Sequence, residues 1–285
     1  MRKIGLISDI HGNITAVEHV IRDARENGVD EFWFLGDLLM PGPGRGELIE
    51  LLQKSNTTAF VKGNWDGCFT SVIEEYDTIN YEDPEEVYIF KLVKYVMEGM
   101  TDEQVQFMFD IPMTVEKEVN GVKFHLSHNL PDKFNGGDLV VHQSAANFTR
   151  LFDHTDAKVA IYGHIHEPLI RQVGMGDERK VINPGAISAT KGKGSNYAIL
   201  RVNEDATWSV EFKYIIHKHE NELEYARHYE LPYFDLYEDT MLNHIYHTHD
   251  AEGINANNEK YDYVEKVKTW LADEKTQIIF RKYKE

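Results

Sequence analysis

Five polar clusters, each at the end of an apolar run, carry the side chains that could do chemistry. Their members are Asp9 and His11 in SDIH, Asp37 in LGDLL, Asn64 and Asp66 in KGNWD, His128 in LSHN, and His164 and His166 in YGHIH. Carboxylate, imidazole and amide oxygen together are ligands for borderline divalent or trivalent ions such as manganese, iron or zinc. The clusters jointly offer enough ligands for two ions, so the sequence predicts a metal site.

Two of these clusters place pairs of ligands at two-residue spacing. On an extended segment, residues i and i+2 point to the same side, so Asp9 and His11 would face one direction, as would His164 and His166. A glycine beside the ligand in GD, GN and GH lets the backbone turn sharply where a strand becomes a loop. Each cluster taken singly is equally typical of a structural loop. Their joint occurrence, always after an apolar run, favours the metal site.

Eight apolar runs predict buried strands that open into these loops. The runs are 3–11, 31–39, 58–66, 122–129, 159–166, 180–186, 196–202 and 208–215. A helical pattern follows the first run, with Ile14, Val17, Ile21 and Ala24 on one face and Gly28 as the stop. Strand–helix–strand repeats predict an α/β fold with a largely parallel sheet early in the chain. In such sheets ligands bind beyond the carboxyl ends of the strands, where the polar clusters fall.

Two segments interrupt the alternation of strands and helices. Residues from about 68 to 112 are predicted as a helical insertion, in which Thr101 and Gln104 resemble a capping box. Residues 216–285 are rich in Tyr, His, Glu and Lys and are predicted as a helical C-terminal extension that forms a lid. The expected organisation is a core of residues 1–215, with the insertion inside it, followed by the extension.

Composition narrows the partners of the 285-residue chain. Its formal net charge of −18 argues against long nucleic acid and anionic membrane surfaces, both of which attract basic patches. The single cysteine, Cys68, permits no internal disulfide. We expect the first residues to form a strand rather than a signal peptide, and no apolar run approaches the length of a membrane span. We expect a cytoplasmic enzyme with a small substrate. If that substrate is anionic, metal ions would supply the positive charge.

The ordered clusters resemble the signature of the calcineurin-like metallophosphoesterase superfamily. The family pattern D-x-H, GD, GN-x-[DE], H and GH-x-H is matched by DIH, GD, GNWD, His128 and GHIH. This resemblance implies a four-layer α/β/β/α sandwich with a dinuclear centre of manganese or iron, or of zinc. It implies one ion held by Asp9, His11, Asp37 and His166. It implies a second held by Asp37, Asn64, His128 and His164, with Asp37 as the bridge.

The chain departs from the protein phosphatases of this superfamily at two places. Trp65 stands where they have a histidine after the GN asparagine, and no Asp-Arg-Gly follows Gly36 and Asp37. Without that histidine to protonate a leaving group, substrates with good leaving groups are favoured, such as phosphoanhydrides and activated phosphodiesters. The resemblance to the small phosphodiesterases and asymmetrical diadenosine tetraphosphate hydrolases points the same way. These act by metal-bridging hydroxide attack, and the tetraphosphate yields ATP and AMP.

Two other readings of the function remain open: a Ser/Thr protein phosphatase-like enzyme, and a non-catalytic scaffold with the same fold. Several residues also have two readings. Asp66 either orients a metal-ligand histidine or stabilises a turn. Trp65 either stacks on a nucleobase or packs in the core. Arg45 either meets a substrate phosphate or lies on the surface. The histidines of NHIYHTHD (243–250) are expected to be solvated or to face from the lid, rather than to bind metal.

Overall fold

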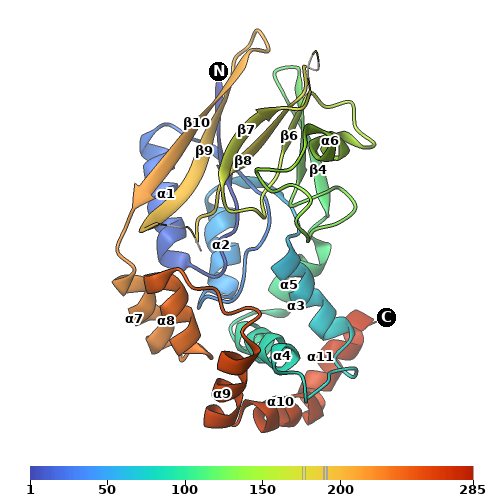
Figure 1. Ribbon diagram of the computed structural model, residues 1–285, viewed down its shortest axis with the longest axis vertical. Helices are drawn as coiled ribbons and strands as arrows, with labels where there is room; N and C mark the ends of the chain where they lie inside the picture. Colours follow the sequence, from blue (N-terminus) through green and yellow to red (C-terminus); the bar gives the residue numbers. More distant parts are fainter. Residues whose placement is uncertain (175, 177, 189, 191, 285) are drawn as a thin grey trace.

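Two five-stranded sheets packed face to face form the core of the fold, in the upper half of Figure 1. The computed structural model describes residues 1–174, 176, 178–188, 190 and 192–284. Helices flank both sheets, so the expected α/β/β/α sandwich is confirmed.

The first sheet has the order β10-β9-β1-β2-β3. Its strands are β1 (Arg2–Ile7), β2 (Glu31–Phe34), β3 (Thr57–Phe60), β9 (Gly194–Val202) and β10 (Trp208–Ile216). The parallel strands β1, β2 and β3 are joined by α1 (Ile14–Glu26) and α2 (Gly46–Lys54), whereas β9 and β10 add antiparallel pairs. The early part of the chain is therefore parallel, as predicted, and the hairpin β9–β10 closes one side of the sheet.

The second sheet has the order β4-β5-β6-β8-β7. Its strands are β4 (Thr114–Val119), β5 (Val122–Ser127), β6 (Val159–Ile161), β7 (Pro168–Gln172) and β8 (Lys180–Pro184). The central strands β5, β6 and β8 are parallel, and the edge strands β4 and β7 are antiparallel to their neighbours. The helical layer on this side is thin, consisting of α6 (Ala145–Thr149) and the 3₁₀ turn η1 (Arg150–Phe152).

Alternating side chains of both sheets fill the space between them. Leu6, Trp33 and Phe124 are fully buried there, and the rings of Trp33 and Phe124 meet edge to face at 5.4 Å. Burial of each such side chain stabilises the fold by roughly 1.5–3 kcal/mol. Because successive residues of a strand point to opposite faces, Phe32 and Phe34 instead pack beneath the helices.

The segment predicted as an insertion, from about residue 68 to 112, contains helices α4 (Pro84–Met97) and α5 (Asp102–Asp110) and most of α3 (Asn64–Glu74), which begins before it. Helix α4 begins at Pro84, with the Asp83 side chain accepting from a main-chain N–H of the first turn. At the start of α5, Thr101 and Gln104 bond to each other's backbone N–H groups, so the predicted capping box is confirmed.

Five helices follow β10. They are α7 (Glu220–His228), α8 (Phe234–Asn243), α9 (Ala251–Tyr261), α10 (Tyr263–Ala272) and α11 (Glu274–Lys284). In Figure 1 they gather with α4 at the lower end of the molecule, where α4 contacts both α9 and α10. One continuous apolar cluster joins these helices to α1, α3 and α4. Among the described residues, no helix has the length and apolarity needed to cross a bilayer.

Candidate metal centre

The carboxyl ends of strands from both sheets converge on one place. Asp9 and His11 follow β1, Asp37 follows β2, and Asn64 opens α3 after β3. His128 follows β5, and His164 and His166 follow β6. Hydrogen bonds tie these loops together. The N–H of Gly163 donates to the carbonyl of His128 within the second sheet, and that of Ser188, which follows β8, donates to the carbonyl of Asp9 in the first. The fold thus brings all seven predicted ligands together.

Most of these ligands lie on left-handed backbone. Positive φ angles of 51° to 70° occur at Asp9, His11, Asp37, His164 and His166. This conformation costs a non-glycine residue free energy and persists only where its surroundings enforce it, typically at functional sites. The surroundings here are main-chain hydrogen bonds, such as those from Ile10 and His11 to the carbonyl of Asp37.

Gly36, next to Asp37, has a conformation and a contact that exclude a side chain. Its φ is +100°, and a Cβ added there would lie 2.5 Å from His128 Nδ1. A glycine is therefore required for His128 to reach the centre beside Asp37.

Asp9, His11 and His166 form one group whose ligand atoms lie within 4.8 Å of one another. The Nε2 atoms of His11 and His166 are 3.1 Å apart, and Asp9 Oδ1 is 3.3 Å from His166 Nε2. Asp9 is fully buried, and in the described part of the chain its Oδ1 has no hydrogen-bond partner. A buried carboxylate oxygen without a donor is costly, and a cation would satisfy it.

Asp9, Asp37 and His128 form the second group, with Asn64 and His164 beside it. His128 Nε2 lies 3.5 Å from Asp37 Oδ2 and 3.1 Å from Asn64 Oδ1. His164 Nδ1 lies 2.9 Å from the same Asn64 oxygen. Asp37 Oδ2 is also 3.7 Å from His11 Nε2, so this carboxylate lies between the two groups, where the resemblance places a bridge.

The hydrogen bonds of three histidines orient one nitrogen of each ring toward the centre. His11 Nδ1 contacts the carbonyl of Met40 at 3.0 Å, His128 Nδ1 that of Leu35 at 2.6 Å, and His164 Nε2 that of Gly136 at 3.1 Å. A carbonyl only accepts, so these ring nitrogens donate and the opposite ones face the centre. Metal-bound histidines are usually held in this way, so the residues present fit a pair of ions.

Charge within the centre shifts the pKa values of its members. Burial raises the pKa of Asp9, but His166, His128 and His11 outweigh it and hold that pKa below its usual value. Burial lowers the pKa of His128, but Asp37 and Asp9 outweigh it and raise that pKa to about 9. A cation bound at the centre would replace the His128 proton, because ligation requires the neutral ring.

Asp66 holds the loops of the centre through the main chain. Its Oδ2 accepts from the N–H groups of Asp37 and Gly63 at 2.9 Å, and its Oδ1 accepts from that of Leu38 at 3.0 Å. Of its two readings, these bonds support loop stabilisation. Its hydrogen bonds go to backbone N–H groups rather than to a ligand histidine.

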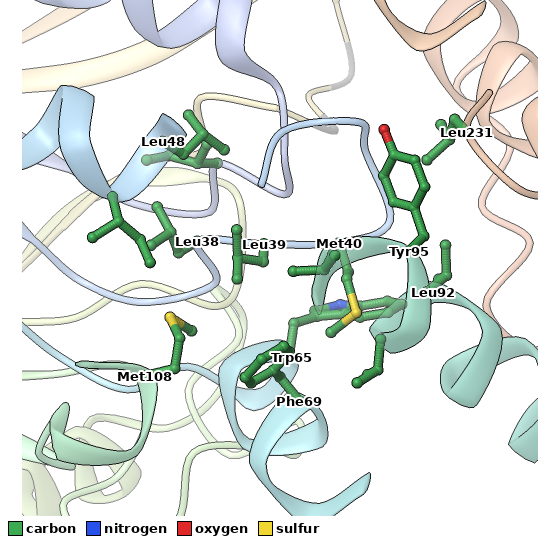
Figure 2. Packing of buried hydrophobic residues seen from close by; sticks show 14 of the residues in the cluster. Leu38, Leu39, Met40, Leu48, Trp65, Phe69, Leu92, Tyr95, Met108 and Leu231 are labelled. Atoms are coloured by element: carbon green, nitrogen blue, oxygen red, sulfur yellow. The ribbon is translucent and has the colours of Figure 1, made fainter. Parts of the chain in front are cut away.

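Apolar packing against helix α3 also stabilises the loop that follows Asp37. Figure 2 shows Leu38, Leu39 and Met40, which follow Asp37, lying in one cluster with Trp65 and Phe69 of α3. Trp65 is 92 % buried in this cluster, yet it lines the cavity and meets the ring of His11 edge to face at 6.1 Å. Its core reading is thus confirmed, and its position also allows contact with a substrate.

A cavity of ≈ 230 Å³ lies over the centre. The centre contributes His11, Asp37, Asn64, His164 and His166 to its lining, and α4 contributes Tyr88. The C-terminal extension contributes Leu236, Tyr237, Thr240, Met241, Tyr246, His247 and Thr248. We call these seven extension residues the cover. The sequence predicts a lid in this region and a solvated or lid-facing position for His247, but it does not single out the other six residues, for which the tyrosine-rich composition is the available signal.

The remaining candidates have structural partners. His247 lies between Asp239 and Asp250, at 2.6 and 2.7 Å, and His249 contacts Glu85. His247 also lines the cavity, as the lid-facing prediction for this segment requires. The Arg45 guanidinium is half-buried and lies 5.2 Å from the ring of Tyr95 and 4.8 Å from that of Tyr229. Arg45 is thus neither at the cavity, where it could meet a phosphate, nor fully on the surface.

Comparison with known proteins agrees with this architecture. The calcineurin-like phosphoesterase superfamily domain matches residues 2–205. An uncharacterized protein of Methanocaldococcus jannaschii, MJ0912, is 23% identical over 235 residues, covering 73% of this chain and 85% of that protein.

Two solved structures share the fold. A metallophosphoesterase from Sphaerobacter thermophilus is 21% identical, with a TM-score of 0.61 over 81% of this chain and 95% of that one. The hypothetical protein PH1004 from Pyrococcus horikoshii OT3 is 16% identical, with a TM-score of 0.63 over 82% and 95% of the two chains. The family match spans well over half of the sequence and contains every predicted ligand. The chain therefore belongs to the calcineurin-like phosphoesterase superfamily.

Proposed function

We propose that the protein is a metal-dependent phosphoester hydrolase that cleaves small nucleotide phosphodiesters or phosphoanhydrides. The observation that carries this proposal is the convergence of seven ligands beneath a cavity that the C-terminal extension covers. When bound, two ions would supply an activated water and neutralise the phosphoryl oxygens during an in-line displacement. We infer manganese or iron, with zinc as the third candidate, because the ligands are imidazole, amide and carboxylate.

The cover favours small substrates over proteins. At ≈ 230 Å³ the cavity is somewhat smaller than typical ligand pockets, which are on the order of 300–1,000 Å³. Such a space accommodates one phosphoryl group with one attached nucleoside, so the remainder of a larger nucleotide would extend beyond it. A folded phosphoprotein cannot bring a phosphoserine into it without displacing the cover.

Aromatic side chains favour a nucleotide as that moiety. Trp65, Tyr88, Tyr237 and Tyr246 all line the cavity, and aromatic faces stack on any base. The Tyr246 side chain is half exposed, and its phenol, like any phenol at neutral pH, keeps its proton and can donate to a phosphoryl oxygen.

The sharpest form of the proposal is asymmetrical hydrolysis of a dinucleoside tetraphosphate. Water attacks a terminal phosphorus of the chain, the anhydride P–O bond breaks, and ATP and AMP leave. No histidine follows Asn64 to protonate the leaving group, and a nucleoside triphosphate is stable as an anion, so it leaves without a strong acid.

A substrate panel tests the proposal. Chelator-stripped protein, with and without added Mn²⁺, is assayed on diadenosine tetraphosphate, bis-p-nitrophenyl phosphate and a phosphoserine peptide, with products separated by chromatography. We expect metal-dependent release of ATP and AMP as the fastest reaction. Peptide as the best substrate would establish the phosphatase-like alternative, two ADP would refute asymmetrical cleavage, and an inert metal-loaded protein would establish the scaffold.

A further inference from the structure

A second group of histidines lies outside the candidate metal centre, where the C-terminal extension leaves the first sheet. His217 and His219 follow β10, His244 ends α8, and His19 lies on α1. The ring centroids of His217 and His219 are 5.3 Å apart, and those of His19 and His217 are 5.5 Å apart. The superfamily match ends at residue 205, before three of these four residues.

A small cavity separates the three histidines of the later segment. It measures ≈ 10 Å³, which is close to the smallest space that holds one water molecule or ion. Its lining residues include His217, His219 and His244, together with Asn13, Ser188 and Met241. The space is thus of single-ion size and rich in nitrogen, oxygen and sulfur.

The tautomer of His217 follows from its hydrogen bonds. Ser195 Oγ donates its one proton to the carbonyl of Ile187 at 2.5 Å, so it must accept from His217 Nε2 at 2.8 Å. The proton of the neutral ring is therefore on Nε2, and Nδ1 presents a lone pair. His217 is 92 % buried, and its Nδ1 has no hydrogen-bond partner within the described residues.

The surroundings keep this lone pair available. Burial, with His219 and His19 nearby, lowers the pKa of His217 to about 4, so the ring is neutral at neutral pH. Both ring nitrogens of His219 are also buried without a partner among the residues that the structure describes. Buried polar atoms without a hydrogen-bond partner destabilise the folded protein, and a bound ion would offset this loss. The carboxylate of Glu220 and the ammonium group of Lys193 shift the pKa of His219 in opposite directions. Their charges therefore oppose each other at this ring and do not exclude a cation.

We propose that His217, His219 and His244 bind one borderline divalent transition-metal ion, separate from the centre beneath the main cavity. Three imidazoles suit zinc, nickel or copper, and Ser195 holds His217 as hydrogen-bond acceptors hold metal-bound histidines elsewhere. Among the described residues, clusters with ligand atoms within 4.8 Å of one another occur only at the first centre. Binding here therefore requires His219 and His244 to rotate toward the ring of His217, which Ser195 holds in place.

Such an ion would join the core to the cover. His217 and His219 belong to the connection between β10 and α7, whereas His244 ends α8, which supplies Leu236, Tyr237, Thr240 and Met241 to the cover. Metal bound there would fix the end of α8 against the first sheet and would stabilise the folded protein by mass action.

Metal counting with matched variants tests the site. Wild type, His217→Gln and His249→Gln are stripped with chelator, dialysed against Zn²⁺ and analysed for zinc per chain. His249 is the control because its side chain is 85% exposed. We expect His217→Gln to hold one zinc fewer than the other two proteins, and zinc to raise the melting temperature of those two more than that of the variant.

A second variant separates binding from folding. His244 has a φ of 59°, which asparagine adopts readily, so His244→Asn should fold while losing its imidazole. Equal zinc counts in wild type, His217→Gln and His244→Asn would overturn the proposal, as would a zinc anomalous-scattering map without a peak beside His217. Failure of the proposed phosphoesterase activity would leave these differences unchanged, because the first centre is the same in all the proteins compared.

Discussion

The two sides of the cavity differ in how they hold their residues. The seven predicted ligands, five of which form the floor of the cavity, lie just beyond the carboxyl ends of strands of both sheets. Several of them have left-handed backbone that main-chain hydrogen bonds hold in place. The cover lies on α8 and the loop after it, and it is held by packed rings and by ion pairs such as His247 with Asp239.

This difference separates two requirements of a hydrolase. Ligand atoms must be positioned within a fraction of an ångström. The hydrogen-bonded, left-handed backbone provides this precision, although it lowers the stability of the fold. A surface that encloses the organic part of a substrate needs only shape and polarity. We therefore expect substitutions in the floor to abolish the reaction and substitutions in the cover to change substrate preference.

The largest effect is expected from Asp37→Asn. Asp37 Oδ2 lies between the two ligand groups, so loss of its charge should weaken the binding of both ions. The fall in kcat/KM should exceed the roughly 10–100-fold that loss of an outer hydrogen-bond partner costs. Activity and metal content are measured beside the exposed control Asp30→Asn. Near-wild-type activity with full metal content would show that Asp37 is not a ligand.

Glu222→Gln probes the joint between cover and core, because Glu222 accepts from the N–H of Thr15 at 3.0 Å and from the hydroxyl of Tyr237 at 3.4 Å. Burial raises the pKa of Glu222 from 4.5 to about 7. The native state therefore holds more protons than the unfolded state between these values, and the free energy of unfolding falls as pH rises.

At about pH 8 the Gln variant should be more stable than wild type by on the order of 3 kcal/mol, with little difference near pH 5. Urea unfolding across this range measures the effect, with the exposed Glu220→Gln as control. Parallel stability curves for Glu222→Gln and wild type would contradict the prediction.

Asp66→Asn probes the floor without touching a ligand. An amide cannot accept at both ends, so at least one of the N–H groups of Asp37, Leu38 and Gly63 loses its partner. We expect a loss of about 1–3 kcal/mol in unfolding free energy and a moderate loss of activity. An unchanged denaturation midpoint would mean that these bonds do not hold the loops.

Tyr246→Ala and Tyr246→Phe probe the cover itself and rest on the proposed nucleotide substrate. Removing the ring should raise KM about 5–10-fold with kcat unchanged, as expected for loss of one stacking contact. The phenylalanine variant retains the ring and tests the hydroxyl alone. A fall in kcat with constant KM for the alanine variant would place Tyr246 in the chemical step instead.

Local sequence signals account for most of the elements. All eight predicted runs contain strands, and Gly28 follows α1 with a φ of +78°, as its stop position requires. The strands β4 and β7 were missed because they lie at the edges of the second sheet and are partly exposed, so neither has a continuous apolar run. Such strands depend on pairing with a neighbour more than on their own composition.

The seven predicted ligands are recognisable from the sequence because each stands at the end of an apolar run and together they follow the order of the family pattern. The sequence does not predict the hydrogen-bond partners of Asp66, because the backbone N–H group is the same in almost every residue. Likewise, nothing local relates Tyr246 or Met241 to Asp37, some two hundred residues earlier, although they line one cavity. The same holds for His217 and His244 around the second cavity.

The amino-acid sequence by itself determined where the strands end and which metal-binding side chains stand there, because burial periodicity and residue chemistry are local properties. Only the tertiary structure decided which helices cover the centre, which ring nitrogens face it and which histidines meet away from it. Those outcomes depend on packing between distant segments, and on hydrogen bonds whose partners are chosen when the segments meet.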